Sequence, residues 1–259
     1  MYFLVLWYNN FGDYMNNDEK IQQLIEYIKE SKNIVFFGGA GVSTESGIPD
    51  FRSVDGLYNM KYDYPPEEIL SHTFFMNKTN EFFTFYKDKL NSLKYEPNIT
   101  HKVLAKLEEK GKLKSIVTQN IDGLHQKAGS KNVLELHGSV LRNYCMKCNK
   151  FYDANYVFNS KELVPKCECG GTIKPDVVLY EEPLDDKIMA QSLKDIASAD
   201  MLIIGGTSLA VYPAAGLINY FRGKHLILIN KSSTPMDYKA DLIINDSLGN
   251  VFRIIGDNI

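Results

Sequence analysis

The sequence has little net charge and no long apolar run, and each absence excludes a class of protein. Its 259 residues carry a formal net charge of −3, so no general attraction draws the chain to nucleic acid or to an anionic membrane. The apolar stretch at residues 1–8, MYFLVLWY, is far shorter than the roughly 20 residues that span a bilayer. No basic region precedes it and no small-residue cleavage site follows, which disfavours an export signal. We expect a cytoplasmic protein that acts as a monomer.

Residues 1–17 are expected to be an extension outside the folded core. An upstream start codon explains them, with Met15 opening the folded part at MNNDEKIQQLIEYIKE. A functional N-terminal arm is the alternative.

Cysteine is scarce, and its four copies occur as two close pairs. The pairs are Cys145 with Cys148 and Cys167 with Cys169. Two disulfides are one interpretation, but a chain without an export signal lies in a reducing compartment. Four thiolates on two tight turns suit tetrahedral zinc, and Gly170 and Gly171 can supply the unusual backbone angles that the tighter second turn needs. We expect a structural zinc, because four sulfur ligands leave no position for a catalytic water.

Short apolar runs alternate with helical patterns along most of the chain. Residues 18–30 have apolar residues at the spacing of one helix face, and residues 100–112 are also helical, with Gly111 as a C-cap. The runs NIVFFGGAG, SIVTQNID, MLIIGGTSL and HLILINKSS end in small or polar residues. The alternation predicts an α/β fold, a Rossmann-like doubly wound parallel sheet that binds ligands at the carboxyl ends of its strands.

Two segments interrupt this alternation, and we expect them to form a smaller inserted domain. Residues 51–98 are rich in aromatics at helical spacing, which predicts a helical module, and residues 138–175 hold the cysteines of a zinc ribbon. The Rossmann-like NAD-binding domain then comprises residues 18–50, 99–137 and 176–259.

The run FFGGAGVSTESGIPDFRS, residues 36–53, begins like a dinucleotide-binding loop. Gly39 and Gly41 fit the first two places of that fingerprint, where backbone approaches a pyrophosphate at a helix N-terminus, and Thr44 holds the third. A dehydrogenase needs an acid for the ribose after a second strand, and none is evident. Asn230, after HLILI, is the better ribose partner.

Five motifs, in order along residues 18–252, resemble those of the sirtuin family of NAD-dependent protein deacylases. They are GAGVSTESGIPDFRS, TQNIDGLH, ELHG, the two cysteine pairs and GTSLAVYPAA. In that family the acetyl-lysine carbonyl oxygen attacks the nicotinamide ribose of NAD, nicotinamide leaves, and the acetyl group ends on ADP-ribose. The resemblance implies a bacterial-type deacetylase with NAD as co-substrate, structural zinc, and acetylated lysine side chains of proteins as substrates.

The resemblance also implies which residues contact NAD. In it, Phe51 shields the reactive sugar carbon, Asn120 and Asp122 hold the nicotinamide carboxamide and order the ribose, and Gln119 contacts a ribose hydroxyl. Amide and carboxylate groups suit a carboxamide, which offers both a donor and an acceptor. The full set is Gly39, Ala40, Gly41, Thr44, Ile48, Pro49, Asp50, Phe51, Arg52, Gln119, Asn120, Ile121, Asp122, His137, Gly206, Thr207, Ser208, Asn230, Lys231 and Leu248.

His137, in LELHGS, matches the family's general base and joins Asn120 and Asp122 as a catalytic residue. An imidazole with a pKa near 6.5 can accept a proton from a ribose hydroxyl at neutral pH. The sugar oxygen can then attack the imidate carbon.

The resemblance places the substrate as an extended strand between PDVVLYEE and LAVYPAA, against Val177, Val178, Leu179, Tyr180 and Val211. The family often has F-G-E where this chain has Tyr180, Glu181 and Glu182, a departure that bears on peptide fit. Sirtuins that prefer succinyl groups carry a Tyr-x-x-Arg pair in the helical insertion, but GLYNMKYDYPPEEIL contains no arginine. We therefore expect acetyl-lysine to be preferred.

Two other functions use the same NAD cradle. A mono-ADP-ribosyltransferase would transfer to a different acceptor, and a non-catalytic NAD or ADP-ribose sensor would only bind. Intact His137 and Asn120 argue against the sensor, because binding alone needs no base.

Overall fold

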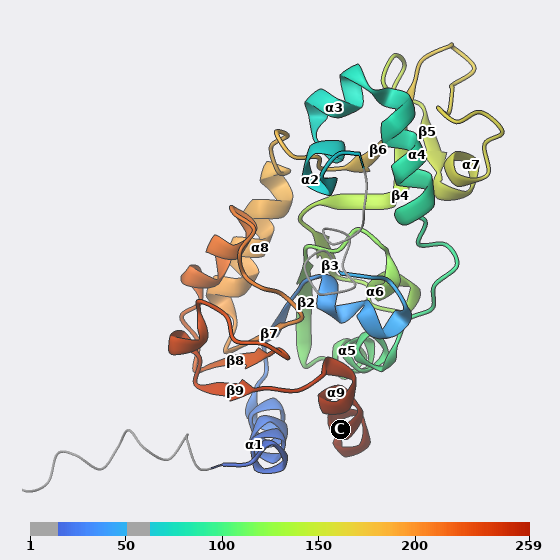
Figure 1. Ribbon diagram of the computed structural model, residues 1–259. Coiled ribbons are helices and arrows are strands. Elements are labelled where there is room, and N and C mark those ends of the chain that lie inside the picture. Colours follow the sequence, from blue (N-terminus) through green and yellow to red (C-terminus); the bar gives the residue numbers. More distant parts are fainter. Residues whose placement is uncertain (1–14, 51–62) are drawn as a thin grey trace, which may run out of the picture.

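The larger part of the molecule is a parallel sheet, seen in the lower half of Figure 1. The computed structural model describes residues 15–50 and 63–259, so Phe51 and Arg52 of the predicted site lie outside the described residues. The six strands have the order β3-β2-β1-β7-β8-β9, and every neighbouring pair is parallel. They are β1 (Ile34–Gly38), β2 (Leu113–Thr118), β3 (Val133–Glu135), β7 (Met201–Gly205), β8 (His225–Ile229) and β9 (Leu242–Ile244).

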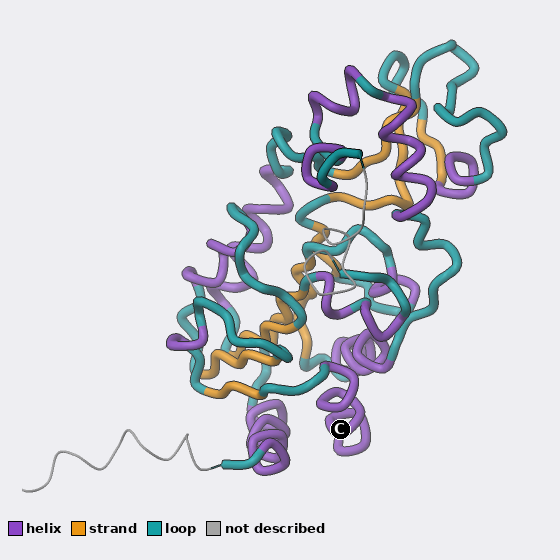
Figure 2. The backbone as a smooth tube through the Cα atoms, in the orientation of Figure 1, coloured by secondary structure: helices purple, strands orange, loops and turns teal. Residues whose placement is uncertain are grey.

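Helices cover both faces of this sheet, as the doubly wound prediction requires; Figure 2 shows the orange strands between purple helices. One face buries Phe36 against α1 (Asn17–Glu30), α5 (Ile99–Glu109) and α9 (Leu248–Asn258). The other buries Phe37 against α8 (Asp186–Ser198) and the 3₁₀ helix η4 (Ala214–Tyr220). Successive strand residues point to opposite faces, and both faces are covered, which explains why the central strands β1 and β7 are apolar throughout.

The first helix forms where the sequence predicts it. Asn16 caps α1, and its side chain and that of Glu19 complete a capping box. The predicted apolar face, Ile21, Leu24, Ile25 and Ile28, is fully buried. At the end of α5, Gly111 takes a φ of +69°, the left-handed conformation expected after a helix C-cap.

A second, antiparallel sheet and a group of short helices form the upper part of Figure 1. The strands β4 (Gly138–Cys145), β5 (Phe151–Asp153) and β6 (Ile173–Val177) have the order β5-β4-β6. The helices are α2 (Pro66–Ile69), α3 (His72–Asn77), α4 (Thr79–Lys89) and α7 (Ala154–Phe158), and α6 (Leu124–Lys127) lies nearer the large sheet. Phe75, Phe82 and Tyr86 share one core with Val140 and Ile173. The helical module, here α2 to α4, and the cysteine-bearing segment therefore stabilise each other.

The glycine loop after β1 differs from the dinucleotide fingerprint in one respect. Two 3₁₀ turns follow, η1 (Ala40–Val42) and η2 (Thr44–Ser46), in place of the helix that the fingerprint implies. Gly47 is left-handed at a φ of +92°, and Pro49 disfavours a helical conformation at the residue before it. The expectation of a helix N-terminus here is wrong.

Candidate active site

A cleft of about 1160 Å³ lies at the carboxyl ends of β1, β2, β7 and β8, between the large sheet and the smaller part of the molecule. This is where the strand order reverses between β1 and β7, the usual ligand-binding position in such sheets. The predicted residues that line it are Ala40, Gly41, Thr44, Ile48, Pro49, Asp50, Gln119, Asn120, Ile121, Asp122, His137, Val177, Val178, Leu179, Tyr180, Gly206, Thr207, Ser208, Val211, Asn230, Lys231 and Leu248. Gly39 lies beside the cleft lining, next to Ala40.

Two backbone loops meet at the floor of the cleft without room for side chains. The amide of Gly41 donates to the carbonyl of Gly206 at 2.8 Å. A Cβ on Gly41 would lie 2.7 Å from the Gly206 Cα, and one on Gly39 would lie 2.8 Å from the Thr207 Cβ. The glycines leave bare main chain at the floor of the cleft, where amide N–H groups other than that of Gly41 suit the phosphates of a dinucleotide; this role stays a prediction.

Three polar side chains under the glycine loop form a hydrogen-bonded chain. The Ser43 hydroxyl donates to Asp122 Oδ2 at 2.7 Å and accepts from Asn120 Nδ2 at 3.1 Å. The Leu124 amide donates to Asp122 Oδ1 at 2.9 Å. Burial raises the pKa of Asp122, although Ser43 and the Leu124 amide oppose the rise. Ser43 was not predicted from the sequence, although its hydroxyl directly after the glycine turn is a signal for such a role.

His137 stands two residues beyond β3 and is held by the backbone of the neighbouring strand. Its Nδ1 lies 3.0 Å from the carbonyl oxygen of Gln119. A carbonyl can only accept, so Nδ1 carries the proton and Nε2 is left as the basic atom of the neutral ring. Burial lowers the pKa of His137, with the Gln119 carbonyl acting in the opposite direction. The ring is therefore neutral at pH 7, as a base must be.

A second set of hydrogen bonds joins the ends of β2, β7 and β8. The Thr207 hydroxyl donates to Gln119 Oε1 at 2.8 Å, and Asn230 Nδ2 donates to the Thr207 carbonyl at 3.1 Å. Gln119 Nε2 is buried and has no partner among the described residues. An unpaired buried donor in a cleft fits a ligand that brings an acceptor, such as a ribose hydroxyl.

The four cysteine sulfurs meet at one end of the small sheet. They lie within 4.8 Å of one another, and none forms a disulfide. Cys145 with Cys169 and Cys148 with Cys167 have sulfurs 3.5 Å apart, close to the edge of roughly 3.8 Å expected for a tetrahedron of sulfurs around zinc. The donor set therefore fits zinc.

Both glycines after the second pair serve this turn, in different ways. Gly170 has a φ of +79°, and a Cβ on Gly171 would lie 2.6 Å from Cys145 Sγ. The Tyr152 hydroxyl adds an outer contact, donating to Cys167 Sγ at 3.1 Å. Cys145 and Cys167 belong to the core shared by the small sheet and the helical module, whereas Cys148 and Cys169 are exposed. The link to this core favours a structural role.

The described helices include none that is long and apolar enough to cross a membrane.

Comparisons with known proteins agree with this geometry. A family model described as the Sir2 family matches residues 39–213. An NAD-dependent protein deacetylase of Clostridium perfringens is 66% identical over 244 residues, covering 93% of this chain and 100% of that relative. One of Clostridium acetobutylicum is 62% identical over 240 residues, covering 92% and 98%. A solved structure of Sir2 with a p53 peptide and NAD⁺ has a TM-score of 0.83 at 36% identity, over 92% of this chain and 97% of that one. The chain belongs to the Sir2 family.

Proposed function

We propose that this protein is an NAD-dependent deacetylase of acetylated lysine side chains in proteins. The observation that carries the proposal is the imidazole of His137, held through Nδ1 by the Gln119 carbonyl in a cleft whose other lining residues suit NAD. Relatives named NAD-dependent protein deacetylase match nearly the whole chain. A sensor would need the cleft but not a base with an unblocked Nε2.

The NAD-contacting residues divide the cleft into three parts in this proposal. Bound NAD supplies an electrophilic ribose carbon and nicotinamide as the leaving group. The loop from Gly39 to Thr44 and the loop from Gly206 to Ser208 hold the phosphates, and Asn230, Lys231 and Leu248 hold the adenosine end. At the other end, Asn120 and Asp122 hold the carboxamide in the orientation that Ser43 fixes from below.

His137 has its role after nicotinamide has left. Its Nε2 accepts the proton of a ribose hydroxyl, so that the sugar oxygen becomes a nucleophile toward the acetyl carbon. The Gln119 carbonyl keeps the ring in the required tautomer and stabilises the imidazolium that forms.

The substrate peptide, in this proposal, adds as an extended strand between the segment Val177–Tyr180 and Val211. The p53 peptide named for a Sir2 neighbour supports a peptide substrate. We further propose that the protein acts as a monomer in the cytoplasm, with neither nucleic acid nor membrane as a partner.

Product analysis tests the proposal. The protein is incubated with NAD and an acetyl-lysine peptide, and the products are identified by mass spectrometry. We expect deacetylated peptide, nicotinamide and acetylated ADP-ribose in equal amounts, and none without NAD. An ADP-ribosylated peptide would make the protein a transferase, and NAD binding without turnover would make it a sensor.

A further inference from the structure

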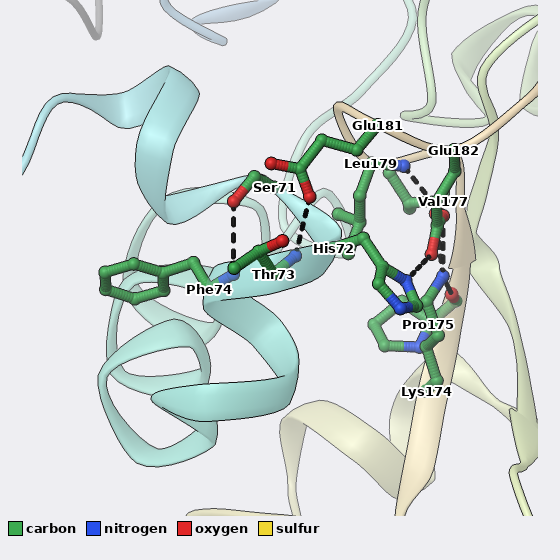
Figure 3. A network of polar contacts seen from close by, with 10 residues as sticks. All are labelled: Ser71, His72, Thr73, Phe74, Lys174, Pro175, Val177, Leu179, Glu181 and Glu182. Carbon is green, nitrogen blue, oxygen red and sulfur yellow. Dashed lines mark hydrogen bonds and ion pairs between the residues drawn. The ribbon is translucent and has the colours of Figure 1, made fainter.

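The segment at residues 177–182, which we call the peptide-binding segment, is fastened to the helical module by two adjacent glutamates (Figure 3). Glu181 stands where the family often has glycine, and it keeps a glycine-like backbone, with a φ of +75°. Residues with a side chain rarely adopt this conformation, because the Cβ crowds the following carbonyl. A contact elsewhere must therefore hold Glu181 in place.

That contact is made at the start of α3. The first three backbone amides of the helix each have an acceptor. The His72 amide donates to the Tyr180 carbonyl at 2.9 Å, the Thr73 amide to Glu181 Oε2 at 2.8 Å, and the Phe74 amide to Ser71 Oγ at 3.1 Å. Two of these acceptors belong to the peptide-binding segment. The hydrogen bond from Thr73 lowers the pKa of the Glu181 carboxyl, so the acceptor is a carboxylate at neutral pH.

Glu182 fastens the same segment from its other side. Its carboxylate lies 2.9 Å from His72 Nδ1 and accepts from Lys174 Nζ at 3.1 Å and from the Leu179 amide at 2.9 Å. Burial works to raise the pKa of Glu182, but these three partners hold it below its ordinary value. The segment is thereby tied to β6 as well as to α3.

The peptide-binding segment also reaches the base. The Val178 amide donates to the carbonyl oxygen of His137 at 2.9 Å. Backbone and side-chain hydrogen bonds therefore run from α3 through the segment to the residue that receives the proton. Tyr180 itself is paired with the helical module, since its amide donates to the Leu70 carbonyl at 2.9 Å and its carbonyl accepts from the His72 amide. A shift at Glu181 would disturb this pairing and, with it, the backbone of Val177–Tyr180 beside which we propose that the substrate strand lies.

We propose that Glu181 is a positioning residue for the acyl-peptide substrate. Its carboxylate, bound to the Thr73 amide, holds Val177–Tyr180 against α3 in the conformation that receives the peptide strand. The glycine of other family members permits the same backbone angle but cannot make this bond. The inference rests on the proposed deacetylase function, and it concerns binding of the peptide, not the chemical step.

Three variants separate the carboxylate contact from the backbone angle. Glu181→Gln keeps an acceptor for the Thr73 amide, Glu181→Gly keeps the angle only, and Glu181→Ala keeps neither. We expect the KM for an acetyl-lysine peptide to stay within about twofold in Glu181→Gln and to rise about fivefold in Glu181→Gly, the loss of one hydrogen bond, with Glu181→Ala at least as impaired. The KM for NAD and kcat at saturating peptide should stay within about twofold.

A readout that needs no turnover accompanies the kinetics. Amide hydrogen exchange at Thr73 in the protein alone should quicken in Glu181→Gly but not in Glu181→Gln. Glu162→Gly, at an exposed loop glutamate outside the cleft lining, is the matched control and should change neither readout.

The outcomes decide whether the Glu181 carboxylate positions the segment for the peptide. A peptide KM in Glu181→Gly equal to or below that of the natural protein would show that only the backbone angle matters, and would overturn the inference. If kcat fell and the KM values for peptide and NAD both rose to the same extent in all three variants, general structural damage would be the cause. That result would also overturn the inference. Absence of deacetylation in the natural protein would defeat the proposed function, while the exchange result would still report whether Glu181 holds the segment.

Discussion

His137 Nδ1 and the Gln119 carbonyl oxygen lie 3.0 Å apart, and this one hydrogen bond fixes which nitrogen of the ring is basic. Replacing His137 with alanine should lower deacetylation about 10²- to 10⁴-fold, the usual contribution of a general base. NAD affinity should fall much less, because the glycine loops supply most of the cradle. Labelled-nicotinamide exchange should partly survive, because that step precedes proton removal. Deacetylation by His137→Ala within a few-fold of the natural protein would contradict the assignment.

The pH dependence of kcat/KM tests the same residue independently. Burial holds the pKa of His137 below its ordinary value of 6.5, and a base is active only when neutral. Activity should therefore persist as the pH falls through 6.5 and decline only at lower pH. A decline centred above 6.5 would show that another group limits the rate or that the ring is less shielded than the structure indicates.

The metal site should be needed for folding of the smaller part of the molecule. Structural zinc contributes on the order of 10 kcal/mol, so Cys167→Ala should unfold the sheet β5-β4-β6 and disturb the helices that share its core. Thermal unfolding with zinc analysis checks this. Tyr152→Phe, which removes only the hydroxyl bonded to Cys167, should stay folded and release zinc to a chelator faster. Full activity and an unchanged melting temperature in metal-free protein would rule out the structural role.

The acyl group should be small and uncharged. No arginine lines the cleft within the described residues; of its lysines, Lys89 pairs with Asp88 at 2.9 Å and Lys231 stands at the proposed adenosine end. An extra buried carboxylate without a partner costs several kcal/mol. Acetyl-lysine peptides should therefore be processed far faster than matched succinyl-lysine peptides. Comparable kcat/KM values on the two peptides would mean that a cation reaches the acyl group.

Stability should fall in mild acid because of two histidines outside the reaction. His101 and His125 are buried with ring centroids 4.7 Å apart. Burial lowers the pKa of His101 from 6.5 to about 4 and that of His125 well below 6.5, where His101 adds to the effect. Well above pH 6.5 both histidines are neutral in the folded and in the unfolded chain. Below it the unfolded chain binds protons that the folded one excludes, so the free energy of unfolding falls as the pH drops toward 4, by up to about 1.4 kcal/mol per pH unit for each histidine.

Urea unfolding between pH 7.5 and 5 measures this slope. His125→Phe removes one of the two imidazoles and keeps an aromatic ring beside Phe36. It should show a shallower dependence on pH than the natural protein. Equal slopes would mean that other groups govern acid stability.

The large sheet was predictable because its central strands, such as β1 and β7, are apolar on both faces and alternate with amphipathic helices. Once the sheet was predicted, most of the cleft could be predicted too, because the residues that follow strands such as β2 and β7 meet at one edge of the sheet. The zinc ribbon was predicted from its cysteines, but the individual strands of the small sheet were not. Its buried residues, such as Val140, Tyr152 and Ile173, are separated by polar residues, and its pairing joins strands far apart in the chain. The left-handed conformation of Glu181 could not be predicted from the sequence either, because the Thr73 amide that binds its carboxylate belongs to a segment far away in the chain.

The contact between Gly41 and Gly206 has a consequence for genetics. A methyl group on Gly41 would meet the α-carbon and carbonyl of Gly206, and one on Gly206 would meet the Val42 amide nitrogen at 2.5 Å. In both cases the obstructing atoms are main chain, which every amino acid possesses. A second substitution can shorten an obstructing side chain, but it cannot remove main-chain atoms. A search for revertants of Gly41→Ala or Gly206→Ala should therefore recover reversion to glycine at the same position. We expect no compensating second substitution among the residues that contact the new methyl group.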